Sequence, residues 1–177
     1  MNALEIAGAS APDLIVPIVG YRQWQLADGM FMSMYDGTPW VDARMNATCD
    51  RGHAPAEVPA KECSCGVYAY YDPCPRTAST ATPDLIGGAV VVWGRIEAHI
   101  YGMRGEHARI VALELPLSRG RKRRAVIEAA DRAGVPVVPH RRLKSVALEH
   151  GAVLQPSLRP KKTLTRAANL WTRNGPV

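Results

Sequence analysis

Alternating apolar and polar residues identify a β-hairpin in the middle of the chain. Residues 89–100 and 107–115 are rich in β-branched side chains, and Gly102 and Gly105 lie between the two runs. This pattern is typical of two antiparallel strands joined by a turn. With the turn centred on Met103, the predicted cross-strand pairs are Ile96 with Ile110 and Ala98 with Ala108 on an apolar face, and Glu97 with Arg109 and His99 with His107 on a polar face.

Shorter apolar runs predict further strands at residues 14–26, 30–35 and 67–71. We expect Pro17 and Gly20 to interrupt the first of these strands. The stretch from 36 to 66 shows no helical period and is rich in Gly, Pro, Asp and Cys. An irregular stretch of this length needs something other than apolar packing to order it.

Helical spacing of apolar residues begins after Ser118. It predicts one helix over residues 121–133 and a second over residues 140–150, and each is followed by a glycine that favours helix termination. Residues 135–139 are expected to form a short extended link. The basic segment 161–171 fits either a third short helix or a tail.

Together these patterns predict an α+β protein. A length of 177 residues suits one core, or one compact domain with an appendage. We expect a mobile leader at residues 1–12 and a mostly antiparallel β domain at 13–118, barrel-like or sandwich-like, with a zinc-ordered loop. A small basic helical region should follow at 119–177, and a surface loop is expected at 72–83.

The charge of the chain changes sign near Ser118. Residues 1–118 contain eight Lys/Arg and thirteen Asp/Glu, whereas residues 119–177 contain fourteen and three. Such a basic region favours an anionic partner, which could be nucleic acid, a cellular protein with an acidic surface, or the acidic first part of this chain. A solubilising run of charge is the remaining interpretation. The candidate anion-binding residues are Arg119, Arg121, Lys122, Arg123, Arg124, Arg141, Arg142 and Lys144.

Many of these cations lie at or just before the start of a predicted helix. Positive charge there opposes the helix dipole unless an anion is bound. Few Asn or Gln residues accompany them, so we expect contact with phosphates rather than readout of base edges. Pro136 and Pro139 in the link do not fit the compact turn of a helix-turn-helix motif.

Four potential metal ligands cluster in the irregular stretch: Cys49, His53, Cys63 and Cys65. Three thiolates and one imidazole form a common tetrahedral set for structural zinc, and a bound ion would supply the ordering free energy that the loop lacks. The Cys-x-Cys spacing departs from the usual Cys-x-x-Cys. Cys74 is an alternative fourth ligand to His53. Free thiols or a disulfide are the other interpretations of these cysteines.

Two sequence blocks resemble a known family. The first consists of Cys49, His-Ala-Pro at 53–55 and Cys-Ser-Cys-Gly-Val-Tyr-Ala at 63–69. The second consists of Trp-Gly-Arg-Ile-Glu at 93–97 with His99, Gly102 and Arg104. Both resemble a pattern in small uncharacterised proteins of actinobacteria and their phages, across residues 20–115, with a weaker similarity at 134–139. The resemblance implies one domain of cytosolic bacterial or phage origin and no particular reaction. Cys74 lies outside the pattern.

No motif in the chain names a reaction, since it has no nucleophile elbow, phosphate loop or dinucleotide fingerprint. The polar hairpin face, with Glu97, His99 and His107, could bind a metal or handle protons, or it could be a solvated face with one Glu97–Arg109 pair. We therefore predict a non-enzymatic binding module that contacts nucleic acid or a cellular protein, with a small enzyme as the alternative. No apolar run is long enough to span a membrane, and a basic signal-peptide start is lacking, so we expect a cytoplasmic location.

Overall fold

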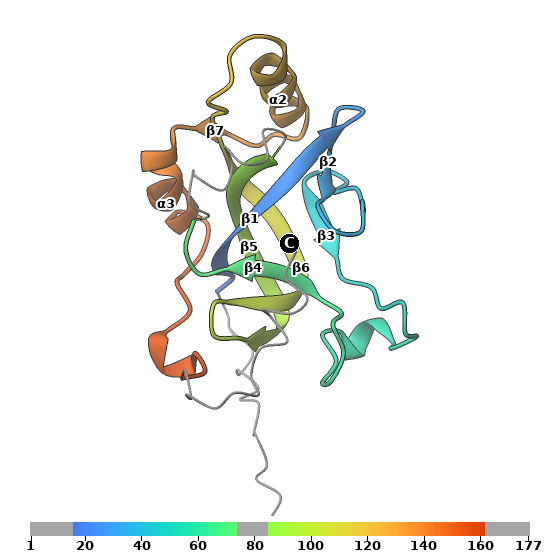
Figure 1. The fold of residues 1–177 in the computed structure, drawn as a ribbon. Helices are drawn as coiled ribbons and strands as arrows, with labels where there is room; N and C mark the ends of the chain where they lie inside the picture. The colour runs from blue at the N-terminus through green and yellow to red at the C-terminus, as the bar shows by residue number, and fades with distance from the viewer. Residues whose placement is uncertain (1–15, 74–84, 162–177) are drawn as a thin grey trace, which may run out of the picture.

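The computed structural model describes residues 16–73 and 85–161 (Figure 1). The predicted leader at 1–12, Cys74 with most of the 72–83 loop, and the basic segment beyond Lys161 lie outside the described residues. Within the described part, no helix is both long and apolar enough to cross a membrane.

In the described residues, seven strands and two α-helices form an α+β fold. The strands are β1 (Ile18–Ala27), β2 (Met30–Ser33), β3 (Arg44–Asn46), β4 (Val67–Tyr70), β5 (Leu85–Ala98), β6 (Gly102–Glu114) and β7 (Val137–Val138). The helices are α2 (Arg121–Arg132) and α3 (His140–Leu148), and the short 3-10 turns are Pro55–Glu57 and Pro156–Leu158. Both predicted helices are confirmed, with α3 ending two residues earlier than expected.

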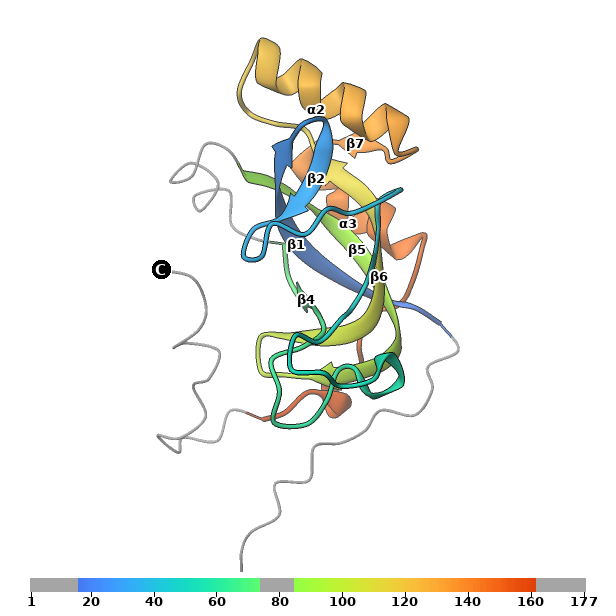
Figure 2. The same ribbon diagram turned by 90° about the vertical axis from the view of Figure 1, so that its right-hand side faces the viewer.

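Four strands close into a ring that resembles a small barrel (Figures 1 and 2). β1 pairs with β5, β5 with β6, β6 with β4, and β4 returns to β1 through Tyr21 opposite Tyr70. β2 extends the ring beyond β1, while β3 and β7 pair with β6. All of these pairings are antiparallel except β6 with β7, so the predicted mostly antiparallel, barrel-like sheet is confirmed.

The hairpin is present, but the predicted register is wrong. The turn lies at residues 99–101, so that Ala98 faces Met103 and Glu97 faces Arg104. The predicted pairs Glu97 with Arg109 and His99 with His107 therefore do not form. A bulge at Gly94 and Arg95 shifts the register again, and beyond it Trp93 lies opposite His107.

The physical reason is that the two expected turn glycines lie inside β6. A Cβ atom at Gly102 would overlap the backbone carbonyl of Ala69 on β4, and a Cβ atom at Gly105 would overlap the side chain of Val92 on β5. These glycines allow close approach of neighbouring strands instead of reversing the chain. Gly94, by contrast, has a φ of +76° and makes the bulge, where a backbone without a Cβ is favoured.

The main core lies inside the ring and beneath α2. Trp24, Met103 and Leu113 are completely buried there, and α2 adds Val126, Ala129 and Ala130. A second apolar cluster forms on the outside of β1, β5 and β6, where α3 packs with Leu143, Val146 and Ala147. The two basic helices thus cover the β-sheet with their apolar faces.

Two other segments differ from the sequence predictions, and a third, the extended link, agrees with them. β1 runs continuously through Gly20, because the missing side chain leaves room for Ala69 of β4. The irregular stretch 36–66 contains β3 and a short 3-10 turn. The expected link at 135–139 contributes β7, which pairs in parallel with the end of β6.

Candidate metal centre and adjoining cavity

The four predicted metal ligands lie together in space. Their ligand atoms are all within 4.8 Å of one another. Cys49 Sγ lies 3.0 Å from His53 Nδ1 and 3.6 Å from Cys63 Sγ. In a tetrahedral zinc site two sulfur ligands are separated by about 3.8 Å, so small shifts would place a metal ion at the centre of this set. The cluster Cys49, His53, Cys63 and Cys65 could hold a metal ion.

The fold brings the two ends of the cysteine loop, residues 47–66, to the same point on β6. β3 ends with Asn46 opposite His107, and β4 begins with Val67 opposite Gly105. Both strands lie along the same part of β6. The loop between them therefore brings Cys63 and Cys65 back to the side of Cys49, more than a dozen residues after the chain leaves it. The loop itself has only a small apolar cluster, which centres on Val58.

Arg104 holds the second half of the cysteine loop in place. Its side chain is almost completely buried and donates hydrogen bonds to the backbone carbonyls of Cys63, Cys65 and Ala60. It also donates to Glu97 Oε2, at 3.0 Å from Nε and 2.5 Å from Nη2. These bonds fix the backbone that carries two of the four candidate ligands, which is the usual role of groups just outside a metal site.

No motif in the sequence gave Arg104 a function. It was named only as part of the second block that resembles a known family. The available signal was a charge inside an apolar strand, between Met103 and Gly105. A buried guanidinium must find acceptors for its hydrogen atoms, but the sequence does not show where those acceptors lie.

Local interactions give the thiols of the cluster different acidities. The hydrogen bond from His53 is the main cause that lowers the pKa of Cys49 to about 6. Burial raises the pKa of Cys65 above its usual value. Cys65 Sγ also accepts a hydrogen bond from the Ala60 amide at 3.3 Å. Near neutral pH, Cys49 therefore offers a thiolate, while Cys65 must lose a proton to bind a metal.

The described cysteines Cys49, Cys63 and Cys65 are free thiols. The separation of 3.6 Å between Cys49 Sγ and Cys63 Sγ is well above the length of a disulfide bond. Cys74, the alternative fourth ligand, lies outside the described residues. His53 completes the set without it.

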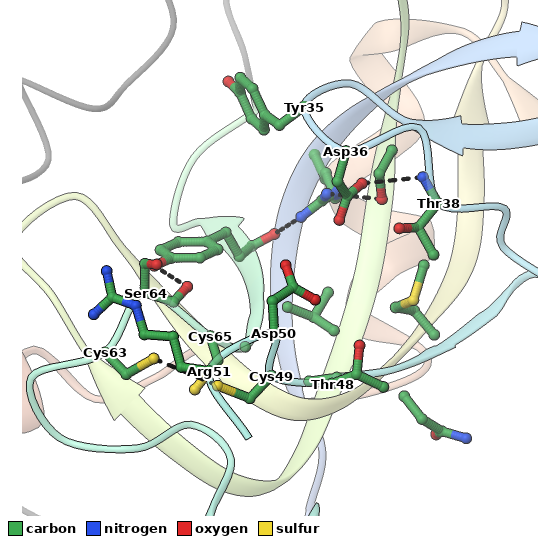
Figure 3. A pocket seen from close by; sticks show the side chains of 18 residues that line it. Tyr35, Asp36, Thr38, Thr48, Cys49, Asp50, Arg51, Cys63, Ser64 and Cys65 are labelled. Atoms are coloured by element: carbon green, nitrogen blue, oxygen red, sulfur yellow. Dashed lines mark hydrogen bonds between the residues drawn. The ribbon is translucent and has the colours of Figure 1, made fainter. Parts of the chain in front are cut away.

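A cavity of about 300 Å³ adjoins the cysteine cluster. Figure 3 shows Cys49, Cys63 and Cys65 gathered at one end of it, and Tyr35, Asp36 and Thr38 at the other. The cavity walls come from four separate segments, around residues 22, 33–38, 45–51 and 63–68. No sequence pattern indicated it, because it forms only when β1, the turn after β2, and the cysteine loop come together.

The three residues of the polar hairpin face have different surroundings. Glu97 lies 3.7 Å from His99 Nε2 and accepts from Arg104. His107 lies opposite Trp93, with Nδ1 2.9 Å from Asn46 Oδ1 and Nε2 3.3 Å from Glu106. Burial lowers the pKa of His99, against the opposing attraction of Glu97. The structure brings Glu97 and His99 together and places His107 elsewhere on the hairpin.

The predicted anion-binding residues lie at the starts of the two helices. Arg119, Arg121, Arg124, Arg141, Arg142 and Lys144 are exposed, and Lys122 and Arg123 are partly exposed. Among residues 16–73 and 85–161, the six arginines and Lys144 form no ion pair with a carboxylate. Neither helix has a side-chain N-cap or an acidic residue in its first turn. The charges of these six arginines and of Lys144 are therefore not paired with carboxylates within the described part of the chain, whereas His140 at the start of α3 lies 2.8 Å from Glu114 Oε1.

No protein-family model, no curated protein and no solved structure matches this chain.

Proposed function

We propose that the protein is a non-enzymatic binding module that contacts nucleic acid through the basic starts of α2 and α3. The observation that carries this proposal is the set of exposed cations without carboxylate partners at both helix starts. If the acidic first part of the chain neutralised these cations, ion pairs between the two parts would be expected. Among the described residues, the six arginines and Lys144 form no such pair, whereas His140 at the start of α3 pairs with Glu114 of β6 at 2.8 Å.

The helix geometry favours phosphate as the group that these cations bind. The first turn of an α-helix leaves backbone N–H groups without acceptors, and the helix dipole adds positive potential there. Gly120 and Pro139 precede the helices and provide no side-chain acceptor for those groups. A phosphate oxygen would accept from the backbone and from the neighbouring arginines together.

We further propose that the Cys/His cluster binds zinc in a structural role. Three thiolates with one imidazole select zinc among the common divalent ions, and four protein ligands leave no position for a reacting water. The ion would join both ends of the cysteine loop, whose own apolar contacts are few. Arg104 would orient the loop carbonyls around this site.

The alternative of a small enzyme at Glu97, His99 and His107 is supported only by the 3.7 Å contact between Glu97 and His99. Glu97 accepts hydrogen bonds from Arg104, and His107 lies away from the other two residues. A partner protein with an acidic surface would use the same cations as nucleic acid, and the test below separates these two partners.

The decisive experiment is titration of the full chain with a labelled DNA duplex at several salt concentrations. Each phosphate contact releases counterions, so log affinity should fall linearly with log salt. Replacing Arg121, Arg123 and Arg124 by Gln should make this slope shallower by about 2–3 units. A matched control replaces the exposed cations Arg44, Lys61 and Arg95 by Gln, which removes the same charge from the sheet and its loops. Equal effects of both variants, or no binding of the native chain at low salt, would contradict the proposal and favour an acidic protein partner.

A further inference from the structure

Arg22 on β1 is a partly buried cation whose hydrogen bonds are incompletely satisfied. Nη1 donates to the Tyr68 carbonyl at 2.8 Å and Nη2 donates to Ser33 Oγ at 3.2 Å. The Nε atom is shielded from solvent and has no acceptor. Within the part of the chain that the structure describes, no carboxylate forms an ion pair with Arg22.

Neighbouring groups offset the charge of Arg22 only in part. Its guanidinium lies 5.5 Å from the ring centre of Trp40, which gives a cation–π contact. Asp36 attracts it from a greater distance, but the Asp36 carboxylate accepts from the Thr38 amide at 3.1 Å. Burial outweighs these attractions and lowers the pKa of Arg22. A partly desolvated cation without a paired anion favours the approach of an anionic group to the part of its guanidinium that stays accessible.

Arg22 is one of the residues that line the cavity beside the cysteine cluster. We propose that this cavity binds a small molecule through its carboxylate group, with Arg22 as the residue that holds the carboxylate. The volume of about 300 Å³ suits a small metabolite, because it lies at the lower end of the range for ligand pockets. Hydroxyl groups of Thr38, Thr48 and Ser64 line the same space and can bind polar substituents of the ligand.

The charges around the cavity favour a monoanionic carboxylate over phosphate. Arg22 and Arg51 contribute positive charge, whereas Asp36 and Asp50 contribute negative charge on the same walls. Thiolates of the cluster add further negative charge at one end. A phosphate dianion would be repelled more strongly by these groups than a single carboxylate, which also matches the planar guanidinium. This site is separate from the basic helices and does not depend on the proposed contact with nucleic acid.

The test is an NMR titration of the zinc-loaded full chain, labelled with ¹⁵N, against three probes. L-lactate carries the carboxylate, L-lactamide is its neutral isostere, and inorganic phosphate is the competing anion. Lactate should shift the Arg22 Nε–H signal and the backbone amides of residues 33–38 and 64–68 in a saturable way. Lactamide and phosphate should bind at least about tenfold more weakly, as expected for loss of a charged hydrogen bond.

Two variants locate the binding to Arg22 and to this cavity. Arg22→Gln should abolish the lactate response, and Arg44→Gln is the control for an exposed arginine outside the cavity. Arg22→Gln also removes contacts that support the fold, so a second variant tests the cavity independently. Thr48→Trp should fill the cavity from an exposed position. Val41→Trp, at an exposed position outside the cavity, is its control. A folded Thr48→Trp variant that still responds to lactate would overturn the proposal. So would equal binding of lactate and lactamide, or tighter binding of phosphate.

Discussion

Glu97 on β5 and Arg104 on β6 form an ion pair that joins the hairpin to the cysteine loop. The pair is close, with Nη2 2.5 Å from Oε2, and the same guanidinium donates to three carbonyls of the loop. Glu97 thereby supports the position of Arg104, and Arg104 supports the backbone of two candidate ligands. The polar face that suggested catalysis in the sequence has a structural role at this point.

Replacing Arg104 by Lys should weaken both the fold and the metal site. An ammonium group keeps the charge but cannot reach three carbonyls and a carboxylate at once. We expect the free energy of unfolding to fall by about 3 kcal/mol and zinc affinity to fall by about tenfold or more. Urea denaturation and competition with a chelator measure the two effects. Arg95→Lys, at an exposed position on the same hairpin, is the control and should change neither quantity.

Purified protein should carry about one zinc ion per chain, as expected for a single four-ligand set. Cys65→Ser should lose the ion together with much of the thermal stability, because metal binding and folding of the loop are coupled. Ser64→Ala changes the exposed neighbour of Cys65 and should retain both. Elemental analysis and thermal melting with and without a strong chelator measure the outcome. A metal-free native chain that is equally stable in chelator would rule out a structural ion.

Zinc affinity should fall on acidification, because protons compete with the metal for the thiolates. The raised pKa of Cys65 means that this thiol releases a proton on binding throughout the neutral range. The pKa of Cys49, about 6, adds a second proton only in more acidic solution. We expect apparent affinity to fall at least about tenfold per pH unit between pH 8 and 6, and more steeply below that range. Chelator competition at several pH values checks this, and an affinity independent of pH would contradict it.

Ile96→Asp should destabilise the protein severely. The Ile96 side chain is 7% exposed and packs in the main core, so the change buries a charge without a partner. We expect a loss of about 3–5 kcal/mol in chemical denaturation. Arg95→Asp places the same charge on the exposed neighbour and should fold normally. A stable Ile96→Asp variant would mean that this face of the hairpin is not buried in solution.

Replacing Arg121, Arg123 and Arg124 by Gln should leave thermal stability unchanged or slightly raise it. No carboxylate partner is lost among the described residues, and the variant removes charge that opposes the helix dipole, an effect of about 0.3–1 kcal/mol per charge. Differential scanning calorimetry checks the result. A clear loss of stability would instead show that these cations interact with the acidic part of the chain.

The sequence predicted the parts of the structure that depend on local pattern or ligand chemistry. Both helices followed from apolar spacing and terminal glycines, and the metal cluster followed from the residue types that bind zinc. The hairpin register did not follow, because a glycine that turns the chain and one that admits a neighbouring strand look the same in a sequence. Gly102 and Gly105 are of the second kind.

Features that are built from distant segments could not be predicted from sequence patterns. The three carbonyl acceptors of Arg104 lie about forty residues earlier in the chain, and the cavity around Arg22 joins four segments. Ring closure rests on a single pair of opposed residues between β1 and β4, Tyr21 and Tyr70. No periodicity in the sequence encodes such a contact.

The closed ring also constrains the order in which the chain can assemble. β5 and β6 are separated by three residues, whereas the partners of β1 on β5 lie 60 to 74 positions away, from Gln25 with Leu85 to Ile18 with Val92. Local contacts form fast, and distant ones must first overcome the entropy of loop closure. During synthesis β1 therefore leaves the ribosome long before its main partner exists. Until the hairpin is made, only β2 can cover the apolar residues of β1. We therefore expect ring closure to be a late step of folding and the one most sensitive to aggregation.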